Sequence, residues 1–412
     1  MKNYVEDSSM KYLVLIPDGM ADYKVEALDN KTPMEAAEKP TMDSLAKKSF
    51  YGLVQNVPEG MVPESDTANM AILSFDPKIY SKGRSPLEAV SMGIKLEGDD
   101  VAIRANTVSL SDAEAYEDRI MLDNAADEIT TEEAAILIDA VNKELSDEQK
   151  QLYVGVAYRH CLVWNGADDK YSFTRPHDII GRRIGEYLPD DESGKIYLDF
   201  MKATCEILDK HPLNEERRKR GKLPANSLWL WSPGKPLTLP SFEEKFGMKA
   251  TAISAVDLIK GIGICAKMDS IDVEGATGTA YTNYKGKADA TIEAFKNGSD
   301  LVYLHFEGPD EHGHAGQADI KTKSIELIDS EALAPILEYL RSTGEDFGIM
   351  ILPDHPTPIK VRTHTHEPVP YIIYSSKNET RGVDIYTEES CRDGVYLPDG
   401  WKLMEYFFEL CK

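Results

Sequence analysis

Short apolar runs that lead into aspartate or histidine recur along this chain, and no other feature restricts its fold as strongly. The run at 12–16 is followed by Pro-Asp-Gly, and the run at 301–306 is followed by EGPDEHGHAG. A third run, at 347–352, leads into PDHPTP. Continuous apolar runs of this length are typical of parallel strands buried on both faces, and open α/β sheets bind ligands at the carboxyl edge of such strands. The pattern predicts Asp and His side chains gathered at one edge of a mostly parallel sheet.

The segments between these runs favour an alternation of helices and strands. Helices are expected at 41–48 and 323–340, and a further helix at 65–73, with small polar residues in its first turn. Further strands are expected at 50–57 and, after THTHE, at 370–374. Alternating strands and helices imply an α/β fold in which helices flank both faces of the sheet.

A chain of 412 residues is too long for one ordinary core, so about two domains are expected. The middle of the chain is polar and lacks motifs of catalysis or metal binding. We therefore expect residues 98–245 to form a smaller domain inserted into a core made of residues 1–97 and 246–412. The insert is expected to bind substrate and to open and close on two hinges. Residues 1–9 are expected to be a short extension.

The net charge of the chain restricts its possible binding partners, and the number and spacing of its cysteines indicate its cellular compartment. The formal net charge of -25 argues against nucleic acid, whose phosphates need a basic surface, but permits a small anionic substrate in a local basic pocket. The five cysteines are odd in number and show no CxxC spacing, which favours a reducing compartment. No signal peptide and no run approaching about 18 apolar residues is present, so the expected location is the cytoplasm, without a membrane partner.

The strongest local signal is a cluster of aspartates and histidines in the last third of the chain. Asp310 and His314 are spaced i, i+4, which can direct both side chains at one ion from a helix or a tight loop. Asp354 and His355 follow the next strand, and His364 and His366 follow them. Carboxylate and imidazole ligands suit Zn²⁺ or Mn²⁺. The alternative is a set of loop histidines with ordinary hydrogen bonds, which the recurrence after three strands disfavours.

Two residues near the N-terminus could join this cluster. Asp18 stands in an ordinary Pro-Asp-Gly turn and gains meaning only beside the C-terminal histidines. Ser65 stands in PESDTAN at an expected helix start, where an N-cap role is the simpler interpretation. The same position could serve a nucleophile, because helix N-terminal amides and a cation both lower the pKa of a hydroxyl.

The chain resembles the archaeal-type cofactor-independent phosphoglycerate mutases, a branch of the alkaline phosphatase superfamily. The resemblance runs from LVLIPDGMAD at 13–22 to HTHEPVPYIIY at 364–374. The motifs between these ends are PESDTANMAILSFDP (63–77), GRSPLEAVSMGI (83–94), YRHCLVW (158–164), NSLWLWSPGKP (226–236), SAVDLIKGIG (254–263), GATGTAYTNYKGKA (275–288), FEGPDEHGHAG (306–316) and LPDHPTP (352–358). The resemblance implies an alkaline-phosphatase-like sheet with an inserted α+β domain.

The resemblance also implies two divalent metal ions, with Mn²⁺ preferred and Mg²⁺, Zn²⁺ or Co²⁺ as alternatives. The ligands of the first ion would be Asp18, Ser65, Asp354 and His355. The ligands of the second would be Asp310, His314 and His364. His364 is preferred to His366 because the family's histidine stands six residues before the proline of the PVP motif, which is Pro370 here. Ser65 would be the nucleophile that carries the phosphoryl group.

Basic residues are expected on the substrate side, since arginine binds carboxylate and phosphate through two parallel hydrogen bonds. By resemblance, Lys260 would reach the transferred phosphoryl group. Arg159 and His160 follow the apolar stretch LYVGVAY and are expected at a strand end. The candidates for substrate binding are Arg84, Arg104, Arg159, His160, Arg182 and Arg183. The basic run 217–220 is expected to be a solvated helix face.

The chain departs from the family pattern at two places. Glu64 precedes the Ser-Asp pair where the family usually has glycine. At 126–129 the chain reads ADEI, where many members have glycine and a basic residue before the isoleucine. A bacterial branch of the family has been proposed to be homoserine kinases, and an added carboxylate could hold the ammonium group of homoserine.

These residues leave several functions open. The first is a phosphoglycerate mutase of glycolysis and gluconeogenesis, and the second an ATP-dependent homoserine kinase of threonine biosynthesis. A catalytically silent metal-binding protein and a simple phosphatase are weaker alternatives, because Ser65 is intact and an inserted domain favours transfer over hydrolysis. The substrate would be a small anionic phosphorylated molecule or an amino acid. The protein would be a monomer or a small homo-oligomer.

Overall fold

The computed structural model describes residues 10–412, so the extension expected at residues 1–9 lies outside the described residues. The chain divides into two compact units. Unit 1 comprises residues 10–81 and 238–412, and unit 2 comprises residues 82–237. The chain therefore leaves unit 1 and returns to it. The hinge motion expected between the two parts stays a prediction.

The boundaries of unit 2 differ from the expected 98 and 245 at both ends. The segment 82–97 belongs to unit 2 because its helix α5 (Ser85–Ser91) packs against two strands of that unit. The segment 238–245 belongs to unit 1, where helix α9 (Phe242–Phe246) places Phe246 against Phe408 with ring centroids 5.2 Å apart. Both segments are amphipathic, so their sequences do not show which unit they belong to. The elements that they pack against determine this.

Unit 1 is built on a sheet in which most neighbouring strands are parallel, as expected. The antiparallel pairs are those that β12 makes with β11 and β2. In sheet order the strands are β13 (Val395–Leu397), β2 (Phe50–Val54), β12 (Val369–Ser375), β11 (Phe347–Ile351), β1 (Lys11–Pro17), β10 (Leu301–Phe306), β8 (Ala250–Ile253) and β9 (Asp269–Ile271). Strands were expected at β1, β2, β10, β11 and β12, and all are present.

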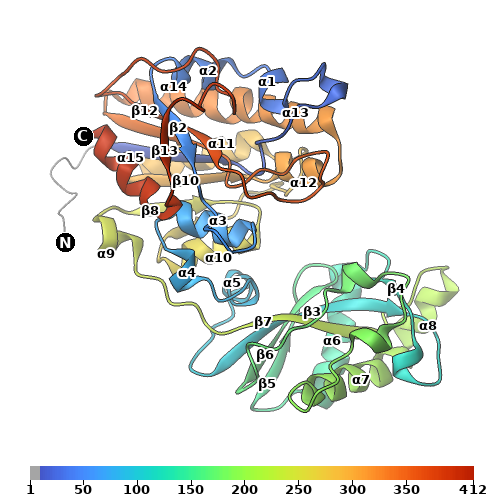
Figure 1. Ribbon diagram of the computed structural model, residues 1–412. Helices are drawn as coiled ribbons and strands as arrows, with labels where there is room; N and C mark the ends of the chain where they lie inside the picture. Colours follow the sequence, from blue (N-terminus) through green and yellow to red (C-terminus); the bar gives the residue numbers. More distant parts are fainter. Residues whose placement is uncertain (1–9) are drawn as a thin grey trace. The chain divides into compact units, whose positions relative to one another are not determined.

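Helices flank this sheet and bring the two ends of the chain together. In Figure 1 the blue N-terminal elements α1, α2 and β2 lie beside the orange and red C-terminal elements of the same unit. The α-helices are α1 (Pro33–Ala36), α2 (Pro40–Ala46), α3 (Ser65–Ile72), α4 (Pro77–Tyr80), α9, α10 (Asp257–Cys265), α11 (Tyr284–Lys296), α12 (Gly308–His314), α13 (Ala318–Leu327), α14 (Ala334–Thr343) and α15 (Leu403–Cys411). The helix expected at 323–340 spans α13 and α14, with a π-helical segment, Ile328–Leu333, between them.

The central strands are buried on both faces, which explains their continuous apolar sequence. Every residue of β10 and β11 is buried, and in β1 only Lys11 and Tyr12 are partly exposed. Leucine, isoleucine and phenylalanine side chains of these strands pack against α11, α13 and α14 in one hydrophobic cluster of the core. A sheet covered on both faces cannot bind a ligand except at its edges or strand ends.

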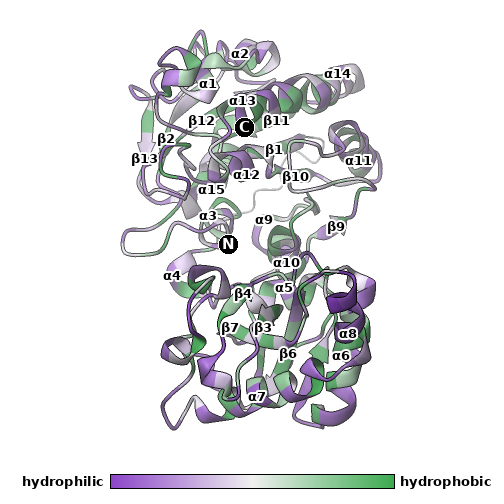
Figure 2. Cartoon of the chain, turned by 90° about the vertical axis from the view of Figure 1, so that its right-hand side faces the viewer, coloured by the Kyte–Doolittle hydropathy of each residue, from purple (hydrophilic) through white to green (hydrophobic). Residues whose placement is uncertain are grey.

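Unit 2 has its own mostly antiparallel sheet and its own core. Its strands are β3 (Asp100–Leu110), β4 (Met121–Asp123), β5 (Lys150–Tyr153), β6 (Arg159–Asn165) and β7 (Ser227–Gly234). Its longer helices are α5, α6 (Thr131–Leu145), α7 (Lys195–Asp209) and α8 (Pro212–Lys219). Figure 2 shows both apolar and polar residues along these helices, as amphipathic helices covering a sheet require.

The basic run on α8 corrects one expectation. Arg217 was expected on a solvated face but is 2% exposed. Its guanidinium donates to the carbonyls of Leu223 and Ala126 and pairs with Glu133. A buried arginine needs such partners, and each of them comes from another part of unit 2.

Among the described residues, none of the helices combines the length and apolar composition that crossing a bilayer requires.

Candidate active site

Three neighbouring parallel strands deliver polar residues to one edge of the unit 1 sheet. β1 lies between β10 and β11, and Pro17 pairs with Phe306 at its end. The residues that follow each strand therefore meet at the same edge. Asp18 follows β1, helix α12 with Asp310 follows β10, and Asp354 follows β11. The strand-then-carboxylate pattern in the sequence thus becomes a cluster in space.

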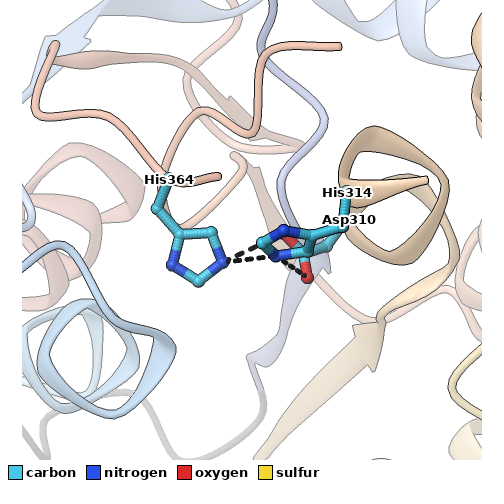
Figure 3. Close-up of side chains that lie close together, drawn as sticks. All are labelled: Asp310, His314 and His364. Atoms are coloured by element: carbon cyan, nitrogen blue, oxygen red, sulfur yellow. Dashed lines mark hydrogen bonds and ion pairs between the residues drawn. The ribbon is translucent and has the colours of Figure 1, made fainter. Parts of the chain in front are cut away.

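The first group that could hold a metal ion consists of Asp310, His314 and His364 (Figure 3). The Asp310 carboxylate lies 3.3 Å from Nε2 of His314 and 3.3 Å from Nε2 of His364. The two Nε2 atoms are 2.9 Å apart. The i, i+4 spacing places Asp310 and His314 on one face of α12, while the loop after β11 supplies His364. The backbone carbonyl of His366 instead accepts a hydrogen bond from Gln55.

The hydrogen bonds of these histidines make the group suitable for a cation. Nδ1 of His314 lies 3.0 Å from the carbonyl oxygen of Arg362, and Nδ1 of His364 lies 2.6 Å from that of Pro63. A carbonyl accepts only, so both Nδ1 atoms carry hydrogen and both Nε2 lone pairs are directed at the same point. The hydrogen bond with Asp310 raises the pKa of His314 to about 9. A divalent cation would displace that proton.

The second group consists of Asp18, Asp310 and His355, whose ligand atoms all lie within 4.8 Å of one another. Asp354 belongs beside it, since its Oδ2 atom is 3.4 Å from Nε2 of His355. The Ser65 hydroxyl lies 3.1 Å from the same nitrogen. The four residues expected around one ion are therefore together, with Asp310 shared between the two groups. The rings of His355 and His364 stack at 3.8 Å, so the groups are adjacent.

Asp18 is the carboxylate of this cluster whose buried charge is least compensated by its neighbours. Asp18 is 2% exposed, and its Oδ1 atom has no hydrogen-bond partner among the described residues. Burial and the neighbouring carboxylates of Asp354 and Asp310 raise the pKa of Asp18 well above its usual value. An orphaned buried oxygen beside two more carboxylates fits a divalent cation, which would remove this cost. The donor set of oxygen and imidazole nitrogen suits the same ions as the sequence predicted.

The Pro-Asp-Gly turn has a steric role in this arrangement. Gly19 has a φ of 62°, and a Cβ built on it would lie 2.8 Å from the Cα and Cβ atoms of Asp310. The Gly19 amide donates to Oδ1 of Asp354 at 3.2 Å. Glycine is required here because α12 approaches the turn so closely and because φ is positive.

Ser65 is the first residue of α3, so the helix N-terminus faces the two groups from a second direction. Glu64 is the N-cap with a φ of -111°, an extended conformation that any residue adopts. The replacement of the family's glycine by Glu64 therefore carries no backbone cost. The macrodipole of α3 favours negative charge near Ser65.

Sequence analysis missed three buried residues that contact this site, namely Asn69, Tyr303 and His305. Asn69 donates to Oδ2 of Asp354 at 2.8 Å, and His305 lies 3.0 Å from Oδ2 of Asp18. Burial lowers the pKa of His305 to about 3, so this imidazole is neutral. The available signal was two polar side chains at alternate positions of the apolar strand LVYLHF, which share one face of the sheet.

Lys260 lies on α10, which packs against α3, the helix that begins at Ser65. Its ammonium group is 3.0 Å from both Asp257 and Asp272. Although burial opposes it, these hydrogen bonds raise the pKa of Lys260. The lysine is therefore cationic on a helix next to Ser65, and its contact with a phosphoryl group stays a prediction.

In unit 2, three of the six candidate substrate residues lie close together. Arg104 pairs with Glu88 at 3.0 Å and lies 4.0 Å over the ring of Trp231. Burial and the neighbouring guanidinium groups of Arg84 and Arg159 lower the pKa of Arg104. This basic cluster, Arg84, Arg104 and Arg159, has the Glu88 carboxylate beside two of its guanidinium groups and can attract an anion.

A histidine that sequence analysis did not consider stands beside the basic cluster. The ring of His177 is 5.7 Å from that of Trp231, edge to face. Burial lowers the pKa of His177, and Arg104 and Arg84 act in the same direction. A neutral imidazole at this position can donate a hydrogen bond to an anion. In the sequence this histidine stands in an isolated RPHD, which was too weak an indication of function to single it out.

The remaining candidates are engaged elsewhere in unit 2. His160 is buried, and its Nε2 atom lies 2.7 Å from the hydroxyl of Thr107. It stands with Arg159 at the start of β6 rather than at the end of the expected strand, because the stretch between β5 and β6 turns. Arg182 bonds Tyr187 at 3.1 Å, and Arg183 pairs with Asp118. A part for these three residues in substrate binding stays a prediction.

The carboxylates at 126–129 serve the fold of unit 2. Asp127 accepts the amide of Leu223 at 3.2 Å and pairs with Lys222 at 3.4 Å. Glu128 is exposed, and Ile129 is buried. The Asp127 carboxylate therefore has partners inside its own unit, which removes the reason for expecting an ammonium-bearing substrate.

Comparison with known proteins identifies close relatives over nearly the whole chain. A family profile described as 2,3-bisphosphoglycerate-independent phosphoglycerate mutase matches residues 46–214. The enzyme of that name from Methanosarcina mazei is 47% identical over 93% of this chain and 96% of its own length. A probable enzyme of that name from Geobacter sulfurreducens is 44% identical over 97% of this chain and 100% of its own length. These names support the mutase over the homoserine kinase.

Two solved structures have the same fold. The PH0037 protein from Pyrococcus horikoshii matches with a TM-score of 0.80 and 29% identity, covering 98% of each chain. A cofactor-independent phosphoglycerate mutase from Thermoplasma acidophilum matches with a TM-score of 0.66 and 26% identity, covering 98% of this chain and 100% of its own.

Proposed function

Because this chain belongs to the family of 2,3-bisphosphoglycerate-independent phosphoglycerate mutases, we propose that it interconverts 2- and 3-phosphoglycerate through a phosphoserine at Ser65. The observation that carries the proposal is the Ser65 hydroxyl, 3.1 Å from His355 and beside two groups able to hold divalent ions. A serine at a helix start, opposite buried carboxylates and imidazoles, is the arrangement that phosphoryl transfer to an enzyme hydroxyl needs.

We propose two divalent ions, with Mn²⁺ preferred. Asp18, Ser65, Asp354 and His355 would hold one, and Asp310, His314 and His364 the other. The chemistry that bound ions supply is a lowered pKa of the Ser65 hydroxyl and neutralised charge on the phosphoryl oxygens. The orphaned Oδ1 atom of Asp18 and the two converging Nε2 atoms of His314 and His364 support this assignment.

Ser65 acts first as acceptor and then as donor. Its Oγ atom forms a bond to phosphorus while the bond from phosphorus to one glycerate oxygen breaks, and that oxygen takes up the proton that Oγ loses. The other hydroxyl of the bound glycerate then attacks the phosphorus of phosphoserine, the bond from Oγ to phosphorus breaks, and Oγ takes up the proton of the attacking hydroxyl. The α3 N-terminus favours the charge of the phosphoserine. Lys260, on the neighbouring helix, is proposed to contact the transferred phosphoryl group.

The basic cluster of unit 2 is proposed to bind the glycerate. Arg84, Arg104 and Arg159 suit a carboxylate, since arginine offers parallel donors in one plane. Trp231 supports the Arg104 guanidinium at 4.0 Å, and His177 adds a neutral donor.

All five cysteines are free thiols, which supports a cytoplasmic location for this reaction.

The test is to incubate Mn²⁺-loaded protein with 3-phosphoglycerate, without added 2,3-bisphosphoglycerate, and to follow the phosphate by ³¹P NMR. The expected result is the resonance of 2-phosphoglycerate rising to equilibrium. A parallel reaction with ATP and homoserine should leave ATP unchanged. Formation of phosphohomoserine without any 2-phosphoglycerate would overturn the proposal.

A further inference from the structure

Two polar side chains of the central strand β10 reach the candidate active site from inside the sheet. Tyr303 and His305 alternate along the strand, so both project from the same face. Each is 0% exposed. A buried phenol and a buried imidazole must form hydrogen bonds, and here His305 bonds Asp18 of the second metal group, while Tyr303 bonds Asn69, which in turn bonds Asp354.

The hydrogen bonds of His305 determine which of its nitrogens carries hydrogen. The Val256 amide donates to the Ser254 hydroxyl at 3.0 Å, and that oxygen lies 3.1 Å from Nδ1 of His305. The ionised Asp18 carboxylate can only accept, so the imidazole hydrogen belongs on Nε2, and the Ser254 hydroxyl can donate its own hydrogen to Nδ1. The imidazole hydrogen is then on Nε2, which donates to Oδ2 of Asp18 at 3.0 Å. Within the part of the chain that the structure describes, Oδ1 of Asp18 accepts no hydrogen bond, so both of its lone pairs are available to an ion.

Tyr303 determines the orientation of a neighbouring amide in the same way. Its hydroxyl donates to Oδ1 of Asn69 at 2.5 Å. The amide nitrogen of Asn69 must therefore face the opposite side, where it donates to Oδ2 of Asp354 and to the backbone carbonyl of Ser65, each at 2.8 Å. One tyrosine thus links a metal-binding carboxylate to the residue that carries the nucleophile.

We propose that Tyr303 and His305 are positioning residues of the metal centre formed by Asp18, Ser65, Asp354 and His355. His305 orients the Asp18 carboxylate, and Tyr303 orients Asp354 and Ser65 through Asn69. Both act from a strand held on each side by parallel neighbours, so the site is mounted on the most rigid part of unit 1. This inference rests on the proposed metal centre and is independent of the identity of the substrate.

The experiment measures Mn²⁺ binding to metal-free protein by isothermal titration calorimetry and by electron paramagnetic resonance. Tyr303→Phe removes one hydroxyl, and His305→Leu removes both ring nitrogens. Outer partners of metal ligands typically contribute about 10- to 100-fold in affinity. We expect a loss of that size at one of the two sites in each variant, while the site of Asp310, His314 and His364 keeps its affinity.

Two further variants separate positioning from general stability. Tyr284→Phe removes another buried hydroxyl of unit 1, which bonds Ala280 and Ser324 away from the site, and it should leave both Mn²⁺ affinities unchanged. His305→Gln keeps a donor near Nε2 and should recover much of the affinity lost in His305→Leu. If His305→Leu does not fold, Tyr303→Phe decides the matter by the same titration.

Wild-type affinity at both sites in Tyr303→Phe and in folded His305→Leu would overturn the inference. An equal loss in Tyr284→Phe would also overturn it, because the effect would then follow from any buried hydroxyl. A wild-type protein that binds two ions but fails to convert 3-phosphoglycerate would contradict the proposed function alone. The two failures are therefore distinguishable.

Discussion

At the scale of single residues, the chemistry of the site depends on groups that burial has placed in unusual states. Ser65 lies 3.1 Å from His355, in a part of unit 1 where Asp18 and Asp354 are almost completely buried. The carboxylates are tolerable there because hydrogen bonds and a cation can compensate their charge. The same environment would convert an ordinary serine hydroxyl into a nucleophile.

Replacement of this hydroxyl should therefore stop the reaction without unfolding the protein. Ser65→Ala removes one hydrogen bond, worth about 1 kcal/mol, so the melting temperature should change little. Turnover of 3-phosphoglycerate should fall to background, and intact-protein mass spectrometry should no longer detect a phosphoryl group after incubation with substrate. Ser44→Ala, an exposed helix serine of the same unit, should remain active and phosphorylated. Normal turnover by Ser65→Ala would falsify the phosphoserine mechanism.

A second residue-scale prediction concerns Lys287, a lysine 1% exposed that donates to the carbonyl of His305. Burial lowers its pKa to about 7. Between that pKa and the unfolded value only the unfolded chain binds the proton, so this group makes the protein more stable as the pH rises. Relative to Lys287→Met, the wild-type free energy of unfolding should increase between about pH 7 and pH 9, by at most about 1.4 kcal/mol per pH unit.

Denaturant unfolding of both proteins at several pH values measures this difference. Lys296→Met, a substitution on the same helix at an exposed position, should show no comparable pH dependence relative to wild type. A constant difference between wild type and Lys287→Met across the range would mean that Lys287 keeps its proton in the folded state.

At the scale of elements, α12 shows how helix geometry selects ligands. Residues four apart share a helix face, while residues two apart point in nearly opposite directions. Asp310 and His314 accordingly face His364, whereas His312 faces Gln317, with Nδ1 2.6 Å from the side-chain oxygen. Two histidines on one short helix therefore have different roles.

This difference predicts the metal content of two variants. His314→Ala removes a ligand of one group and should reduce bound Mn²⁺ from about two ions to about one per chain, since Asp18, Asp354 and His355 remain. His312→Gln should keep both ions. Inductively coupled plasma mass spectrometry of the two purified variants, after equal dialysis, gives the count. Equal metal content in the two variants would contradict the assignment.

At the scale of the whole molecule, the two units carry different chemistry. Unit 1 holds both metal groups and Ser65, while unit 2 holds the basic cluster around Trp231. Each unit has its own hydrophobic core, so a substitution in one should leave the local structure of the other intact. Binding of substrate and binding of metal should therefore be separable.

Arg104→Leu should test this separation. It removes a cation that Glu88 and Trp231 hold in place, and the KM for 3-phosphoglycerate should rise by about tenfold or more, as expected for the loss of a charged hydrogen bond of about 1.5–3 kcal/mol. Bound Mn²⁺ should stay at the wild-type level. Arg220→Leu, at an exposed arginine of the same unit that pairs with Glu133, serves as the control. A loss of metal in Arg104→Leu would show that the units are not independent.

The amino-acid sequence alone determined the elements and the chemistry of the main ligands. Apolar runs with polar ends predicted β1, β10 and β11, because a strand buried on both faces leaves a continuous signal. The i, i+4 spacing predicted that Asp310 and His314 act together, because it reflects local helix geometry. The order of motifs identified the family.

Only the tertiary structure decided which distant residues meet. It connected Tyr303 to Asn69 and buried Arg217 in a run that looked solvated. It also moved both unit boundaries, since α5 and α9 are amphipathic and could have packed in either unit. The physical reason is that periodicity and spacing record local geometry, whereas these contacts depend on the order β11-β1-β10 in the sheet and on packing between elements far apart in the chain.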